Sequence, residues 1–169
     1  CVIASSTSER LPFASAMEHS ARPQWASKSH AFAIRISSEF GHSWSMTTEA
    51  SLCEVAATIL AKALAGREIS ARDVIEAHLA RIAAGDAQLS AFITVDADGA
   101  RRQADACDAA SAPIGPLHGV PIAVKDLTNT RGLRTTYRSL LFQNHVPDQD
   151  ELVVARLRQA GAIIIGKTN

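Results

Sequence analysis

The feature that most constrains this chain is the segment Ala162–Ile165, an unbroken apolar run of one alanine and three isoleucines that ends at Gly166. Isoleucine is β-branched, and its stiff side chain favours a strand over a curled loop. A strand without polar alternation is buried on both faces, so its sheet needs helices on either side. The run therefore predicts an α/β layered fold.

Helical and strand-like patterns alternate before this run. Apolar residues at helical spacing predict four helices, the second beginning with a capping box of Ser70 and Asp73. Gly66 and Gly85 are expected to end the first two helices. The helices are predicted over 49–65, 70–85, 97–110 and 151–160, the strands over 91–95, 120–124 and 162–165, and a loop-rich stretch over 128–149. Because no covering element follows the last strand, we expect a truncated domain.

Residues 1–45 differ from the rest of the chain in composition and in apolar periodicity. They hold 11 of the 16 serines and no aspartate, and no apolar periodicity persists in them. Two explanations stay open: an organelle transit peptide, or upstream sequence translated in frame before a start at Met46. Both predict a poorly ordered segment without function and place the incomplete domain at 46–169.

The composition argues against several classes of protein. The 17 basic and 17 acidic residues balance, so there is no electrostatic case for nucleic acid or an anionic membrane as partner. No apolar run approaches the roughly 20 residues that span a bilayer. Three widely spaced cysteines exclude a disulfide scaffold and a CxxC zinc site and favour a reducing, cytoplasmic location. The histidines show no metal-ligand spacing, and no cofactor is expected.

Gly161–Thr168 formally matches the phosphate-binding pattern G-x-x-x-x-G-K-[ST]. A phosphate-binding loop needs its strand before the first glycine and a flexible turn between the glycines. Here a helical pattern comes before Gly161, and the residues between the glycines are alanine and isoleucines. The context therefore favours a buried strand, and nucleotide binding is kept only as an alternative.

Lys125 directly follows the predicted strand 120–124, and two interpretations of it are open. If the strand carries the amine into apolar surroundings, its charged form is disfavoured and the neutral amine can serve as a base. If the strand ends in water, Lys125 stays exposed and pairs with Asp126, as most lysines are exposed. Spacing alone favours the second interpretation.

Three blocks in fixed order resemble the N-terminal part of the amidase signature family. They are GPLHGVPIAVKD at 115–126, GLRTT at 132–136 and VVARLRQAGAIIIGKTN at 153–169, and the resemblance covers about 48–169. It implies a large mixed β-sheet covered by α-helices and a hydrolase of carboxylic amides, with a small-molecule amide as substrate. It also implies a Ser–cis-Ser–Lys triad in which Lys125 is the general base.

The sequence departs from the family pattern in two places. The Gly/Ser-rich block that carries both triad serines is expected beyond Asn169, so we predict that the 169-residue chain alone is inactive and poorly soluble. Arg138 stands where the family pattern has a glycine, although a glycine there would permit a positive φ. Two further alternatives stay open: the A subunit of a tRNA-dependent glutamine amidotransferase, and a degenerate fragment without catalysis.

Overall fold

The computed structural model describes residues 52–169 and, before them, the backbone of two short strands, β1 (Ile34–Ser37) and β2 (Ser43–Met46). β1 and β2 pair antiparallel, with Ile34 opposite Met46. Most of the segment 1–45 and the predicted helix start at Glu49 lie outside the described residues, and the division at Met46 stays a prediction.

The central sheet has three strands: β3 (Phe92–Val95), β4 (Pro121–Lys125) and β5 (Ile163–Thr168). β5 lies in the middle, antiparallel to β3 and parallel to β4. The sheet is therefore mixed, as expected for this α/β fold. The isoleucines of β5 are buried, which fits the central position that their unbroken apolar run predicts.

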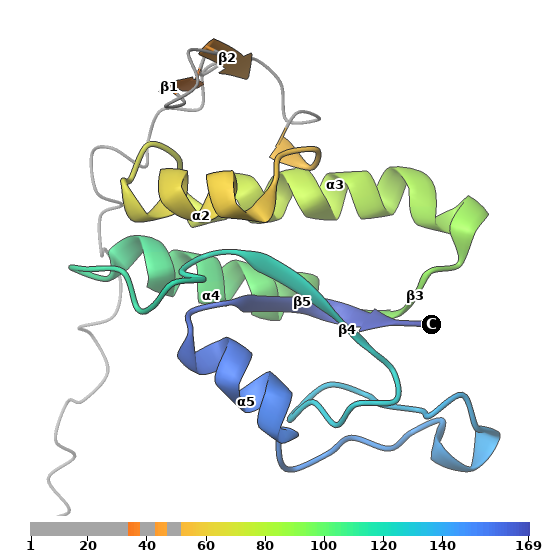
Figure 1. The fold of residues 1–169 in the computed structure, drawn as a ribbon. Coiled ribbons are helices and arrows are strands. Elements are labelled where there is room, and N and C mark those ends of the chain that lie inside the picture. Colours follow the sequence, from red (N-terminus) through yellow and green to blue (C-terminus); the bar gives the residue numbers. More distant parts are fainter. Residues whose placement is uncertain (1–33, 38–42, 47–51) are drawn as a thin grey trace, which may run out of the picture.

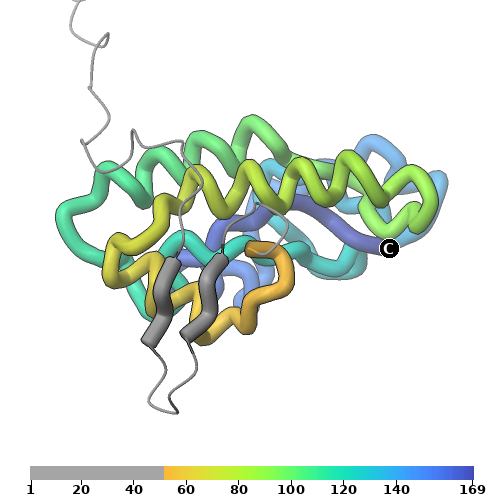
Figure 2. Tube along the Cα trace, turned by 90° about the horizontal axis from the view of Figure 1, so that it is seen from above, coloured from red at the N-terminus to blue at the C-terminus, as the bar shows by residue number. Residues whose placement is uncertain are grey.

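Helices cover both faces of this sheet (Figure 1). On one face lie α2 (Ala57–Ala65), α3 (Ala71–Leu89) and α4 (Ala97–Ala109), and on the other lies α5 (Leu152–Gln159). Seen from above, α3 and α4 run side by side (Figure 2). Each face has its own apolar cluster: Ile163 and Ile165 contribute to the one beneath α2–α4, and Ile164 packs with Val154 of α5 in the other.

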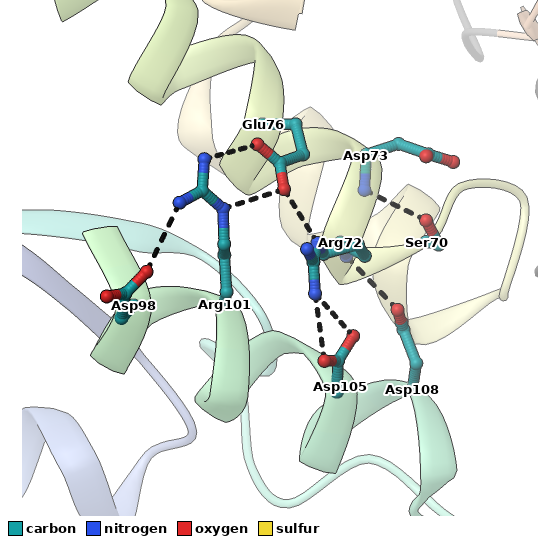
Figure 3. Close-up of polar contacts among 8 residues, drawn as sticks. All are labelled: Ser70, Arg72, Asp73, Glu76, Asp98, Arg101, Asp105 and Asp108. Atoms are coloured by element: carbon teal, nitrogen blue, oxygen red, sulfur yellow. Dashed lines mark hydrogen bonds and ion pairs between the residues drawn. The ribbon is translucent and has the colours of Figure 1, made fainter. Parts of the chain in front are cut away.

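Polar contacts join α3 to α4 at the start of α3 (Figure 3). The Ser70 hydroxyl accepts from the N–H of Asp73, as the capping box predicts, while the Asp108 carboxylate on α4 accepts from the N–H groups of Ala71 and Arg72 at 2.7 and 3.1 Å. Burial raises the pKa of Asp108 in spite of these bonds. The first turn of α3 is thus capped both by its own serine and by a neighbouring helix.

Three of the predicted elements need correction. The helix predicted over 49–65 is interrupted, because Leu52 is helical, residues 53–56 are not, and α2 begins at Ala57; the start predicted at Glu49 lies outside the described residues. α3 passes through Gly85 and ends at Leu89, where Ser90 takes the left-handed conformation with φ 49°. The last strand continues beyond Ile165 through Gly166 to Thr168. The loop-rich stretch 128–149 is confirmed, with one short 3₁₀ turn at Leu140–Phe142.

Candidate active site

Lys125 is the last residue of β4, and its side chain is exposed. Of the two interpretations of Lys125, exposure at the end of the strand, which spacing favours, is confirmed, and burial of the amine in apolar surroundings is wrong. The predicted pairing of Lys125 with Asp126 is wrong as well. Asp126 is 1% exposed, and its carboxylate accepts a hydrogen bond from the N–H of Thr136 instead. The structure therefore presents the Lys125 amine at the open end of a strand, next to a buried carboxylate.

Backbone and side-chain bonds of Asp126 fix the turn that follows Lys125. The Asp126 N–H donates to the carbonyl of Thr168 on β5 at 2.8 Å, and the Asp126 carbonyl accepts from the N–H of Tyr137 at 3.2 Å. The carboxylate accepts from both the N–H and the hydroxyl of Thr136. Because all these groups belong to Asp126, the backbone next to Lys125 has little freedom to move.

A second lysine lies at this end of the sheet, and the sequence pattern pointed to it only as part of the phosphate-binding motif at Gly161–Thr168. Lys167, near the end of β5, is fully buried, and its ammonium donates to the carbonyl of Thr128 and to the hydroxyls of Thr130 and Thr135, the latter two at 3.0 Å. Burial lowers the pKa of Lys167, and the nearby carboxylates of Asp126 and Glu151 act against this shift. An ammonium has three donors, and here each donor has an oxygen acceptor.

A β-bulge explains why the side chain of Lys167 faces the loop that holds Thr128, Thr130 and Thr135. Strict alternation along β5 would place Lys167 on the same face as Ile163 and Ile165, against α2–α4. Between β4 and β5 the register shifts, because Ile122 pairs with Ile164 while Ala123 pairs with Gly166. The extra residue resets the alternation, so Lys167 lies on the opposite face. The only sequence signal is a single lysine at the end of an apolar strand.

Two consecutive threonines lie between the buried charges of Asp126 and Lys167. Thr136 binds the Asp126 carboxylate, and the Thr135 hydroxyl accepts from the Lys167 ammonium. Both threonines are buried, and the Thr135 hydroxyl in turn donates to the carbonyl of Leu133 at 3.1 Å. The two oppositely charged groups thus anchor the same short segment from two sides.

The residues after this threonine pair adopt a conformation that favours glycine. Tyr137 and Arg138 have φ values of 49° and 60°. Position 138 thus has the positive φ that a glycine would permit, and arginine adopts it there at a cost in free energy.

We expect the substitution Arg138→Gly to raise the free energy of unfolding by about 0.5–1 kcal/mol, because glycine adopts this φ without a steric penalty. The control is Arg102→Gly, which removes the same exposed side chain from the middle of α4 and should lower stability by about 1 kcal/mol. Urea unfolding of the two variants measures both changes. An equal loss of stability in both would contradict the assignment of strain to Arg138.

The geometry contradicts a phosphate-binding loop at Gly161–Thr168. Residues 163–168 form the central strand, as the isoleucines predict, and the Lys167 ammonium is buried and bonded to threonine oxygens. Among residues 52–169, no cluster of histidine, cysteine, aspartate and glutamate has the arrangement of metal ligands. None of the helices described is long and apolar enough to cross a membrane.

Comparisons with known proteins agree with this geometry. The family model described as Amidase matches residues 73–169. Two glutamyl-tRNA(Gln) amidotransferase A subunits are similar: the one from Roseiflexus sp. (strain RS-1) is 48% identical over 110 residues, and the one from Acidothermus cellulolyticus is 50% identical over 113. These matches cover 64% and 65% of this chain but only 23% and 22% of the relatives, so the chain spans less than a quarter of their length.

Solved structures show the same fold. The peptide amidase from Stenotrophomonas maltophilia matches with a TM-score of 0.66 and 34% identity, over 71% of this chain and 26% of that enzyme. A structure named fatty acid amide hydrolase matches with a TM-score of 0.67 and 25% identity, over 72% of this chain and 22% of that one. Since the family model covers more than half of its residues, this chain belongs to the amidase signature family.

Proposed function

We propose that the full-length protein hydrolyses small carboxylic amides in the cytoplasm and that Lys125 is its general base. The observation that carries the proposal is the placement of Lys125: an exposed amine at the end of β4, on a turn fixed by the buried Asp126, in a member of an amide-hydrolysing family. A general base must reach the proton that it accepts, and a rigid turn holds it in one direction.

In the proposed reaction, a serine hydroxyl attacks the amide carbon, and its proton passes through a bridging serine to the Lys125 amine. The C–N bond then breaks, and the leaving amine takes the proton back along the same route. Water hydrolyses the acyl ester and restores the free serine. The two serines are those that the family resemblance implies, and we propose that they come from sequence beyond Asn169.

The substitution Lys125→Met tests this function. It removes the base while keeping a long side chain, so we expect kcat for ammonia release from simple amides to fall by at least about 100-fold. The matched control is Lys62→Met, which makes the same change at an exposed position on α2 and should leave kcat unchanged. Full activity of the Lys125→Met enzyme would overturn the proposal.

One observation supports a second candidate function, the A subunit of a glutamine amidotransferase. The curated relatives with 48–50% identity carry that name. The same Lys125 chemistry would then release ammonia from glutamine for a partner subunit. The ammonia assay separates the two candidates: turnover of glutamine alone, increased by a co-purifying partner, indicates the amidotransferase, whereas turnover of several simple amides by the protein alone indicates an amidase.

A further inference from the structure

We propose that Lys167 is a positioning residue for amide hydrolysis: its buried ammonium holds the segment 128–135 and, through that segment, the turn that directs Lys125. The inference rests on the proposed function of Lys125. Lys167 itself reaches no solvent in the described chain, so it acts only through the backbone that it binds.

The hydrogen bonds of the Lys167 ammonium all go to one segment, which we call the 128–135 loop. Thr128 offers its carbonyl, and Thr130 and Thr135 offer their hydroxyls. The Thr130 hydroxyl donates its own hydrogen to the Thr128 carbonyl at 3.2 Å, which leaves its lone pairs for the ammonium. An ammonium only donates, so these three oxygens satisfy it without a carboxylate in direct contact.

The 128–135 loop connects Lys167 directly to the Lys125 turn. The N–H of Thr128 donates to the carbonyl of Lys125 at 3.0 Å, and the carbonyl of Thr128 accepts from the Lys167 ammonium. The next residue of β5, Thr168, accepts from the N–H of Asp126. Two consecutive residues of the central strand therefore hold the turn, one through its side chain and one through its backbone.

A buried charge is a poor way to gain stability, which points to a role in geometry. Burying an ammonium has a large desolvation cost, and an apolar side chain of similar volume often serves stability as well. Three directed bonds, however, fix the loop in one arrangement, whereas apolar packing at the same site fixes it less tightly. A displacement of about 1 Å at a catalytic group can reduce turnover on the order of 100-fold.

The experiment compares four variants of the full-length protein in the ammonia assay, each at a temperature where it is folded. Lys167→Met removes the charge, and Thr130→Val removes one of its three acceptors. Val154→Ala is the control: Val154 is fully buried on the same side of the sheet, in α5, but has no role in the site. Lys125→Met reports on the proposed function.

We expect Lys167→Met to lower kcat by about 10- to 100-fold with KM within about twofold, because misalignment of the base affects the chemical step. Thr130→Val should lower kcat less, by about threefold, because two bonds to the ammonium remain. Val154→Ala should lower the melting temperature but leave kcat unchanged. This split between kcat and KM separates positioning from loss of stability.

The inference is overturned if Lys125→Met is inactive while Lys167→Met is folded and keeps the kcat of the Val154→Ala control. If Lys167→Met does not fold, Thr130→Val decides: a kcat equal to wild type overturns the inference and a reduced kcat supports it. Unchanged activity of Lys125→Met would instead overturn the proposed function, and the inference with it.

Discussion

Replacing Asp126 with asparagine should lower the free energy of unfolding by about 3 kcal/mol, because it removes one of the two carboxylates that offset the charge of the buried Lys167 ammonium. Asp126 is 1% exposed, and the field of its carboxylate favours the charged form of Lys167. Asparagine keeps the shape of the side chain, but it replaces one acceptor oxygen with an NH₂ donor. One of the bonds from Thr136, whose N–H and hydroxyl both donate to the carboxylate, then meets a donor.

Urea unfolding measures this loss, and Asp148→Asn is the matched control. Asp148 lies exposed in the same long loop, so its substitution should change stability by less than about 0.5 kcal/mol. The double variant Asp126→Asn with Lys167→Met tests the cause. If the charges offset each other, it should lose less stability than the sum of the single variants, by about 1 kcal/mol or more. If the two single losses of stability simply add in the double variant, the charges of Asp126 and Lys167 do not stabilise each other.

Local periodicity predicted most of the elements that build this fold. The strands at 91–95 and 120–124 and the helices at 97–110 and 151–160 lie within one or two residues of the observed ones. Each is specified by side chains that are neighbours in the sequence: β-branched residues in the strands and evenly spaced apolar residues in the helices. The capping box at Ser70 is likewise local, and the structure confirms its bond to the N–H of Asp73.

The wrong helix end at Gly85 has a tertiary reason. Glycine inside a helix costs only about 1 kcal/mol relative to alanine, which other contacts can offset. Here the continued helix places Asp86 so that its carboxylate accepts from the N–H groups of Ala91 and Phe92, at 2.8 and 3.0 Å. These bonds direct the chain into β3, and no pattern within 70–85 indicates them.

The site was predictable only in part, for a related reason. Position 125 was identified through motif resemblance and its exposure was favoured by spacing, but the buried state of its neighbour Asp126 depends on contacts with 136–137 and with β5. The direction of Lys167 was missed because it depends on a register shift between β4 and β5, and a bulge leaves no periodic trace in the sequence. A period of two, applied without the bulge, would place this lysine against α2–α4.

Gly166→Ala should be among the most damaging single substitutions in the sheet, with an expected loss of about 3 kcal/mol. A Cβ at this position would lie 2.3 Å from the backbone carbonyl oxygen of Thr94 and 3.2 Å from the Cα of Val95. Gly166 pairs with Val95 on β3 and with Ala123 on β4, so the backbone is held on both sides. To relieve the clash, β3 would have to move away from β5. That movement would occur next to Lys167, the residue that follows Gly166 on β5.

The same substitution at Gly85 is the control and should have the opposite sign. A Cβ at Gly85 would meet nothing within 4 Å, and the residue lies inside α3, where alanine is the better helix former. We expect Gly85→Ala to raise the free energy of unfolding by about 0.5–1 kcal/mol. Urea unfolding of both variants measures the contrast. A gain in stability at Gly166 would show that β3 and β5 are not packed as closely as the structure has them, and a loss at Gly85 would contradict the continuous helix.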